Sequence, residues 1–264
     1  MDDAVCFESG ATHFEHFDPT TLSCDRNGIP FLSRREIESV AVGLLWEHCP
    51  WVLAAPSVTP VLDILDQLKL QTGLSAKFAE LGHRDADKIV GRIRFRHRLL
   101  YLDSSLAKER EAGFRFILAH EIGHWVLHRS SFEGWKSPDF DTRESAVENP
   151  VDGLFPFRRR TPGESLEFQA RTFASALMMP HRTFTSAFVQ LREEFGFSAV
   201  NARDNLEKLV LCLGDTFQVS KTCVRIRIEE LKLLANGDFE SVTGLPAEGE
   251  PAPVDHSSFS AASV

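Results

Sequence analysis

Two histidines with a glutamate between them carry the clearest chemical signature in the chain. His120, Glu121 and His124 follow the pattern H-E-x-x-H inside the stretch FRFILAHEIGHWVLHR. Residues four apart on a helix lie on one face, one turn above each other, so both imidazoles can bind one Zn²⁺ ion at about 2.0–2.1 Å. The glutamate between them can accept a proton from a water molecule on that ion. The spacing therefore predicts a catalytic zinc site with His120 and His124 as ligands and Glu121 as general base.

The residues around the motif predict the helix that this spacing requires. An apolar stripe with helical periodicity runs along one face, and the two histidines lie on another; the stripe consists of Leu118, Ile122, Trp125 and Val126. We expect the helix to be capped at Ser104 or Ser105 and to end at about Arg129. An H-E-x-x-H pattern also arises by chance, and this helical context is what favours a metal site.

A catalytic zinc usually has three protein ligands, and two residues are candidates for the third. Glu167 lies one turn into a second helix, predicted from the capping sequence TPGE at residues 161–164. Ala170 and Ala174 follow on a neighbouring face and would let another helix approach closely. His128 is the alternative, but ligands at i, i+4 and i+8 of one straight helix separate by about 6 Å per step and cannot converge. By residue type alone, Glu167 is a ligand or a solvated glutamate, and His128 packs against the site or hydrogen-bonds to a ligand.

Two blocks of sequence resemble a known family when they are taken together. The first is LAHEIGHWVLH at residues 118–128, and the second is E-x-x-A-x-x-F-A-x-x-L-M-M-P at residues 167–180. Both closely resemble the ImmA/IrrE family of zinc metallopeptidases, and a looser likeness covers about residues 33–237. The resemblance implies that zinc is bound by His120, His124 and Glu167. It also implies that Glu121 is the catalytic base.

The same resemblance implies a substrate and a biological role. Members of the family typically cleave a helix-turn-helix repressor and so switch on stress-response or mobile-element genes. This sequence departs from the family pattern at Arg171, where asparagine is usual, and in the long gap between His124 and Glu167. Neither departure changes a ligand, but both bear on substrate specificity.

Composition and charge limit the class of protein. The 264 residues are 43% hydrophobic, and the five cysteines are scattered without C-x-x-C spacing, as expected for reduced thiols of a cytoplasmic protein. No stretch has the length of a membrane span, and the N-terminus lacks the pattern of a signal peptide, so no membrane partner is expected. The net charge of −9 argues against nucleic acid as the main partner, because DNA binding needs a basic surface.

We expect a mostly helical α+β fold, with a zincin-like metallopeptidase domain at residues 33–196 and a small antiparallel sheet. Residues 88–101 (KIVGRIRFRHRLLY) alternate between apolar and basic side chains, which predicts a hairpin that turns near His97. In zincins the free edge of such a strand commonly pairs with an extended substrate. Ser33 and Glu36 form a capping box that opens a further helix; two residues that follow it, Trp46 and Trp51, are expected in the core.

The remaining segments are interpreted from their composition and periodicity. Residues 1–32 are interpreted as an N-terminal extension, and residues 238–264, rich in Pro, Gly, Ser and Glu, as a disordered tail. Residues 130–160 have no clear period and are interpreted as a long insertion, either a lid over the cleft or an idle segment. Residues 197–237 predict a helix-turn-helix-like region with three basic residues available for phosphates: Lys221, Arg225 and Arg227.

The sequence thus favours a zinc-dependent endopeptidase that acts on a protein substrate. One alternative is a DNA-binding regulator with a structural zinc, and another is a toxin–antitoxin-type module that keeps the fold without turnover. Glu121 counts against both, because a structural site has no use for a carboxylate at that position. The residue that stabilises the oxyanion is left open among three candidates: Tyr101, His97 and His181.

Overall fold

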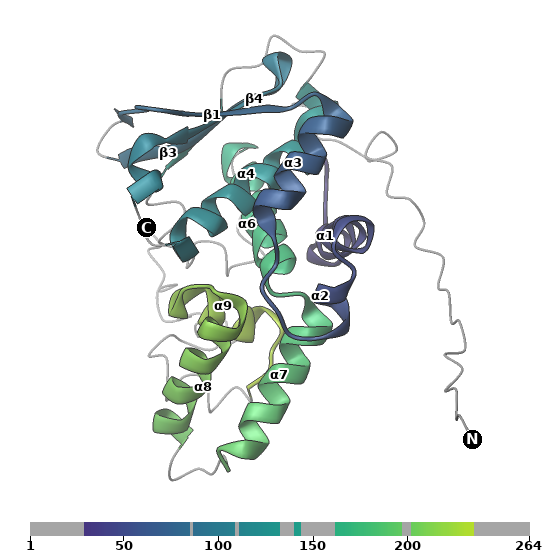
Figure 1. Cartoon of the computed structure of the whole chain (residues 1–264), viewed down its shortest axis with the longest axis vertical. Helices are drawn as coiled ribbons and strands as arrows, with labels where there is room; N and C mark the ends of the chain where they lie inside the picture. The colour runs from purple at the N-terminus through teal and green to yellow at the C-terminus, as the bar shows by residue number, and fades with distance from the viewer. Residues whose placement is uncertain are drawn as a thin grey trace, which may run out of the picture.

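The computed structural model describes residues 29–84, 87–108, 111–132, 140–143, 162–196 and 202–234. These residues form a mostly helical α+β structure, as predicted (Figure 1). The helices are α1 (Arg34–His48), α2 (Trp51–Ala54), α3 (Val61–Thr72), α4 (Glu111–Phe132), α6 (Pro162–Met178), α7 (His181–Glu194), α8 (Ala202–Phe217) and α9 (Lys221–Glu230). The strands are β1 (Ser75–Ala79), β2 (His83–Arg84), β3 (Asp87–Arg94), β4 (Leu99–Asp103) and β5 (Phe140–Arg143). The sheet lies at one end of the molecule, and α7, α8 and α9 lie at the other.

The sheet is mixed, so the prediction of an antiparallel sheet is only partly right. β3 and β4 form the predicted hairpin, with a 3₁₀ turn at Phe95–His97 and Ile93 opposite Leu100. β1 pairs with the other side of β4 and runs parallel to it. The sequence of β1, SAKFA, has a weak strand signal, and its partner is the second strand of the hairpin rather than the strand next in sequence, so local periodicity could not reveal this pairing.

β5 occupies the edge of β3 that was expected to be free for a substrate, so that expectation is wrong. Ile93 lies opposite Phe140, and Gly91 lies opposite Thr142. The register then shifts by one residue, which places a bulge at Val90. β5 belongs to the segment interpreted as an insertion; the rest of residues 133–160, and with it the lid hypothesis, lies outside the described residues.

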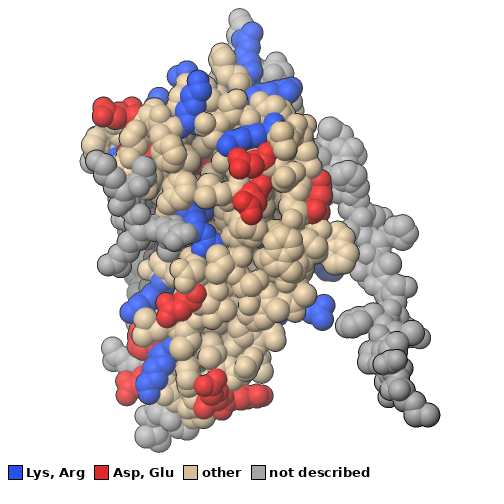
Figure 2. Space-filling view, in the orientation of Figure 1, with Lys and Arg blue, Asp and Glu red and all other residues tan. Residues whose placement is uncertain are grey.

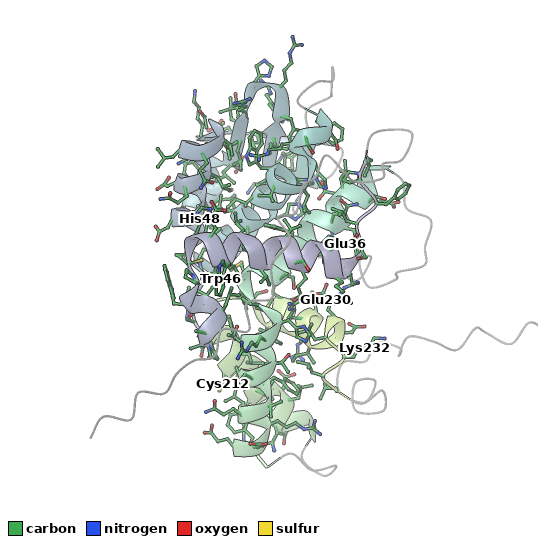
Figure 3. All side chains as sticks on the ribbon, turned by 90° about the vertical axis from the view of Figure 1, so that its right-hand side faces the viewer. Glu36, Trp46, His48, Cys212, Glu230 and Lys232 are labelled. Carbon is green, nitrogen blue, oxygen red and sulfur yellow. The ribbon has the colours of Figure 1, made fainter. Side chains whose placement is uncertain are left out.

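Helix α1 begins as predicted and buries an apolar stripe made of Ile37, Val40, Ala41 and Leu45. The Ser33 side chain accepts a hydrogen bond from the Glu36 backbone, and the Glu36 carboxylate accepts one from the Ser33 backbone, which completes the capping box. The prediction that Trp46 and Trp51 lie in the core is wrong, because they are 63% and 57% exposed. Trp46 follows the fully buried Leu45 and is therefore turned by about 100° away from the core (Figure 3).

Helices α8 and α9 are joined by a tight turn, and the Ser220 side chain caps α9. The prediction that Arg227 is available for phosphates is wrong, because this residue is buried and its guanidinium pairs with Glu38 of α1. Glu230 accepts a hydrogen bond from Arg34 at 2.8 Å, which also fastens α9 to α1 (Figure 3). Arg225 pairs with Glu207 of α8. The helix-turn-helix-like character of residues 197–237 stays a prediction.

Charged side chains of both signs are spread over the surface. On the face in Figure 2, Lys and Arg gather at the extreme tip of the sheet end, and acidic and basic side chains are mixed over the rest of the face. On the outer side of the sheet, Tyr101 of β4 pairs in register with Lys77 on one side and Arg92 on the other. None of the helices in the described part of the chain has the length and hydropathy to cross a membrane.

The two helices that carry the candidate ligands approach each other closely. Gly123 of α4 faces Ala170 of α6, so a Cβ atom at position 123 would lie 3.0 Å from the Ala170 carbonyl oxygen. The same atom would lie 3.0 Å from the Phe173 ring. This contact agrees with the expectation that Ala170 and Ala174 allow close packing. The active-site helix itself spans Glu111–Phe132, with Ser104 and Ser105 in a separate 3₁₀ turn, so the prediction that one of them caps it is wrong.

We predict that Gly123→Ala and Gly113→Ala, two changes in the same helix, have opposite effects on stability. A methyl group at 123 must push α6 away, at a cost of about 1–3 kcal/mol in the free energy of unfolding. A methyl group at the exposed Gly113 would lie more than 4 Å from any described atom outside the neighbouring backbone of its own helix, so alanine there should add about 0.5–1 kcal/mol through helix propensity. Urea unfolding measures both, and equal stabilisation by the two changes would contradict the close contact.

Candidate metal centre

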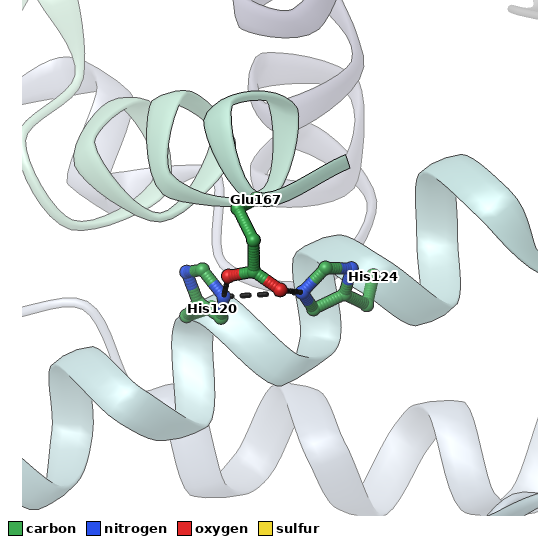
Figure 4. Close-up of side chains that lie close together, drawn as sticks. All are labelled: His120, His124 and Glu167. Carbon is green, nitrogen blue, oxygen red and sulfur yellow. Dashed lines mark hydrogen bonds and ion pairs between the residues drawn. The ribbon is translucent and has the colours of Figure 1, made fainter. Parts of the chain in front are cut away.

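Three side chains predicted as ligands converge on one point. His120 and His124 come from successive turns of α4, and Glu167 reaches them from α6 (Figure 4). The two Nε2 atoms are 3.1 Å apart, and Oε2 of Glu167 lies 3.1 Å from Nε2 of His120. Oε1 of Glu167 lies 3.4 Å from Nε2 of His124. Among the described residues, these three form a group with the spacing of metal ligands.

The spacing of these atoms fits a tetrahedral zinc ion. With bonds of about 2.0–2.1 Å, the ligand atoms of such an ion are about 3.3 Å from one another. The two Nε2 atoms are 3.1 Å apart, and the Glu167 carboxylate meets them through different oxygens, Oε2 at 3.1 Å from His120 and Oε1 at 3.4 Å from His124. Two histidines and one glutamate are a donor set of catalytic zinc sites, which leave a fourth position for water or substrate. With one ligand atom from each residue, all three lie within 4.8 Å of one another, so the donor set and its spacing fit a zinc ion.

Burial and charge make this cluster a strong site for a cation. The imidazoles of His120 and His124 are buried, and the Glu167 side chain is 22% exposed, so Glu167 is the member of the cluster that reaches solvent. Burial would raise the pKa of Glu167, but the neighbouring His124 and His120 hold it far below its usual value. Burial lowers the pKa of His120 to about 4. Burial acts in the same direction on His124, but the Glu167 carboxylate outweighs it and raises the His124 pKa. Without metal, a proton on His124 therefore balances the charge of Glu167.

Glu121 lies beside the ligands and contacts the sheet. Its side chain is fully buried, and its negative charge contributes to the raised pKa of His124. The carboxylate packs against Gly91 on the inner face of β3, where any Cβ atom would overlap it. Gly91 follows the bulge at Val90. Sequence reasoning missed this role of Gly91, for which the only signal was a glycine among the apolar residues of the strand.

Other side chains of α4 and α6 affect the cluster without joining it. His128 is not one of the three ligands; its Nδ1 lies 3.2 Å from Nδ1 of His124, and Gln169 contacts its other ring nitrogen. Arg171 lies one turn after Glu167, and its positive charge lowers the pKa of His120 further. His128 was expected to pack against the site or to hydrogen-bond to one of the metal-binding residues, whereas nothing in the sequence indicated the role of Gln169.

The structure narrows the candidates for stabilising the oxyanion. Tyr101 pairs with Arg92, and Gly91 pairs with Leu102, so Tyr101 and Gly91 point to opposite faces of the sheet. Glu121 lies against Gly91, and Tyr101 is therefore on the wrong face, where the Arg94 guanidinium stacks on its ring at 5.5 Å. The proposal of Tyr101 is wrong. His97 and His181 are exposed, in the β3–β4 turn and at the start of α7.

Comparisons with known proteins leave the family open. No protein-family model matches the chain, and no curated protein matches it. A transcriptional regulator of Mycobacterium tuberculosis has a similar structure over 77% of this chain and 48% of that chain, at 16% sequence identity and a TM-score of 0.43. This chain thus spans about half the length of that regulator, and the likeness is too low to carry a conclusion about fold or function.

We predict that zinc stabilises the protein more at about pH 7.5 than at about pH 5.5, because the ion must displace the proton shared by His124 and Glu167. The raised pKa of His124 stabilises the metal-free protein below the ordinary value of 6.5 and stops doing so as the pH rises through the folded value. The lowered pKa of Glu167 stabilises it above 4.5, and this contribution is lost as the pH falls through the folded value. The metal-free pair is therefore most favourable between these two pH values.

Melting temperatures with added zinc and with chelator, measured across this pH range, give the size of the zinc effect. Glu167→Gln is the matched control, because it removes the carboxylate that raises the His124 pKa and should bind zinc weakly at every pH. A zinc effect that grows as the pH falls would contradict the assignment of these ligands.

Proposed function

We propose that this chain is a zinc-dependent endopeptidase with a zincin-like core. The observation that carries the proposal is the convergence of His120, His124 and Glu167 beside Glu121, which is held against Gly91. A structural metal site needs only ligands. A buried carboxylate next to the ligands, for which the adjacent strand leaves space, is what a general base needs.

Each of these side chains has a defined task in peptide hydrolysis. Zinc, when bound, polarises the scissile carbonyl group and lowers the pKa of water towards 7. Glu121 accepts the proton of the attacking water and passes it to the leaving amine. Gly91 leaves the Glu121 carboxylate room beside the ligands, so the base is positioned before the substrate arrives.

The proposed substrate is a helix-turn-helix transcriptional repressor, whose cleavage would derepress stress-response or mobile-element genes. Support for this substrate comes from the resemblance of residues 118–128 and 167–180 to the ImmA/IrrE family. DNA as the main partner is less well supported, because the net charge is −9 and Arg227 is engaged by Glu38. A regulatory protein with a non-catalytic metal site is the alternative, and it predicts zinc binding without turnover.

The direct test is to incubate the purified protein with the repressor encoded nearest to its gene, with zinc and with chelator. We expect cleavage with zinc and none with chelator, and mass spectrometry of the products locates the scissile bond. Full zinc occupancy with an intact repressor would favour the regulatory alternative.

We predict that Glu121→Gln keeps zinc but slows cleavage by at least about 100-fold, because the amide cannot accept the proton of water. Zinc content and cleavage rate are measured on the same sample. Glutamine has nearly the same size and shape, so the packing against Gly91 is preserved. Wild-type rates in this variant would end the assignment of Glu121 as the base.

A second variant disturbs the base without changing it. Gly91→Ala places a methyl group where the Glu121 carboxylate lies, so we expect a loss of cleavage similar to that of Glu121→Gln, with zinc retained. Arg92→Ala is the neighbouring control, because Arg92 points to the other face of the sheet. If both changes in β3 leave the rate unaltered, the contact between Gly91 and Glu121 has no catalytic role.

A further inference from the structure

A chain of buried hydrogen bonds leads away from one of the two ligand histidines. Nδ1 of His124 lies 3.2 Å from Nδ1 of His128, and Nε2 of His128 lies 3.0 Å from Oε1 of Gln169. Nε2 of Gln169 donates to the carbonyl oxygen of Pro30 at 2.8 Å. The three side chains are at most 5% exposed, so water does not compete for these contacts.

The far end of this chain determines the direction of every bond in it. The Pro30 carbonyl can only accept, so the NH₂ group of Gln169 must face it. The amide oxygen of Gln169, which also only accepts, then faces His128, whose Nε2 must carry a hydrogen. Burial disfavours a charged imidazole, so His128 is neutral and its Nδ1 is a bare acceptor. Nδ1 of His124 must therefore be the donor in the bond between the two rings.

We infer that His128 and Gln169 are positioning residues that hold the proton of His124 on Nδ1 and so turn the Nε2 lone pair towards the metal; this inference rests on the zinc site proposed above. A free neutral imidazole can carry its hydrogen on either nitrogen. Only the form with the hydrogen on Nδ1 can bind a metal through Nε2, the atom that faces His120 and Glu167. The same Nδ1 hydrogen is present when His124 is protonated, so binding zinc requires loss of the Nε2 proton alone.

The other ligand histidine has no such support in the described part of the chain. Nδ1 of His120 is buried and has no hydrogen-bond partner there. Ligand histidines usually donate their second ring N–H to an oxygen, and loss of that partner typically weakens metal binding about 10–100-fold. Here His124 meets this requirement through a second histidine, and the backbone oxygen of Pro30 ends the chain.

The tautomer itself can be measured without metal or substrate. Two-bond ¹H–¹⁵N correlation spectra of the wild-type protein, with metal removed, distinguish a protonated from a bare ring nitrogen. We expect His128 to carry its hydrogen on Nε2 and none on Nδ1. A hydrogen on Nδ1 of His128 overturns the inference, whatever the protein binds or cleaves.

Substitutions test the consequence for zinc affinity. Asn is nearly isosteric with the near side of the imidazole and keeps an acceptor at the position of Nδ1, whereas Leu removes it. We therefore expect His128→Leu to weaken zinc binding by about 10–100-fold and His128→Asn to recover much of that loss. Gln169→Leu should weaken binding in the same direction, because His128 then loses the acceptor that fixes its tautomer.

Asn205→Leu is the matched control, since Asn205 is a buried amide that donates to the Phe195 carbonyl oxygen at 2.9 Å in another part of the molecule. Its zinc affinity should equal that of the wild type. Equal affinities in all variants, with tight binding by the wild type, overturn the positioning role and leave the zinc site standing. A wild-type protein that binds no zinc overturns the proposed function and this inference together.

Discussion

The close contact between α4 and α6 is the constraint on which the site depends. Gly123 and Ala170 have no side chains beyond a methyl group, so the two backbones meet directly beside the ligands. Gly123 lies between the two histidines on α4, and Ala170 lies one turn after Glu167 on α6. Glu167 has a short side chain and spans this gap only because the helices are so near. The ligand geometry thus depends on the helix contact, because a larger residue that pushes α4 and α6 apart also moves Glu167 away from the two histidines. α1 packs on α6 and, through Arg34 and Glu230, connects it to α9.

The same region contains several buried ionisable groups, which cost free energy unless each is compensated. The charge of Glu167 is balanced by His124, and the neutral His128 is satisfied by Gln169. Glu121 is placed at the boundary between α4 and β3, where Gly91 makes room for its carboxylate. The two histidine ligands and the base therefore share α4, whereas α6 supplies the third ligand and β3 contacts the base.

Much of the local structure could be predicted from the sequence, because its causes are local. The capping box at Ser33, the cap at Ser220 and the hairpin near His97 follow from residue types within a few positions. Several of the failures involve neighbours that are distant in sequence. Arg227 looked like a phosphate ligand because Glu38, its partner, lies 189 residues away. The pairing of β5 with β3 and the parallel pairing of β1 with β4 also join residues that are not neighbours in sequence. His120, His124 and Glu167 lie together as the family resemblance implied, whereas the contact of Gly91 with Glu121 leaves no periodic signal.

The hydrogen bond between Gln169 and Pro30 has a thermodynamic consequence for the segment at residues 29–32. Ile29 is buried, and the Pro30 carbonyl ends the chain of bonds that begins at His124. A ligand that binds Nε2 of His124 requires the hydrogen on Nδ1, the form in which the chain of bonds is complete, and so favours the docked segment. By linkage, docking raises the affinity for that ligand by the same factor. Ligand binding at the cluster and docking of residues 29–32 are therefore thermodynamically coupled.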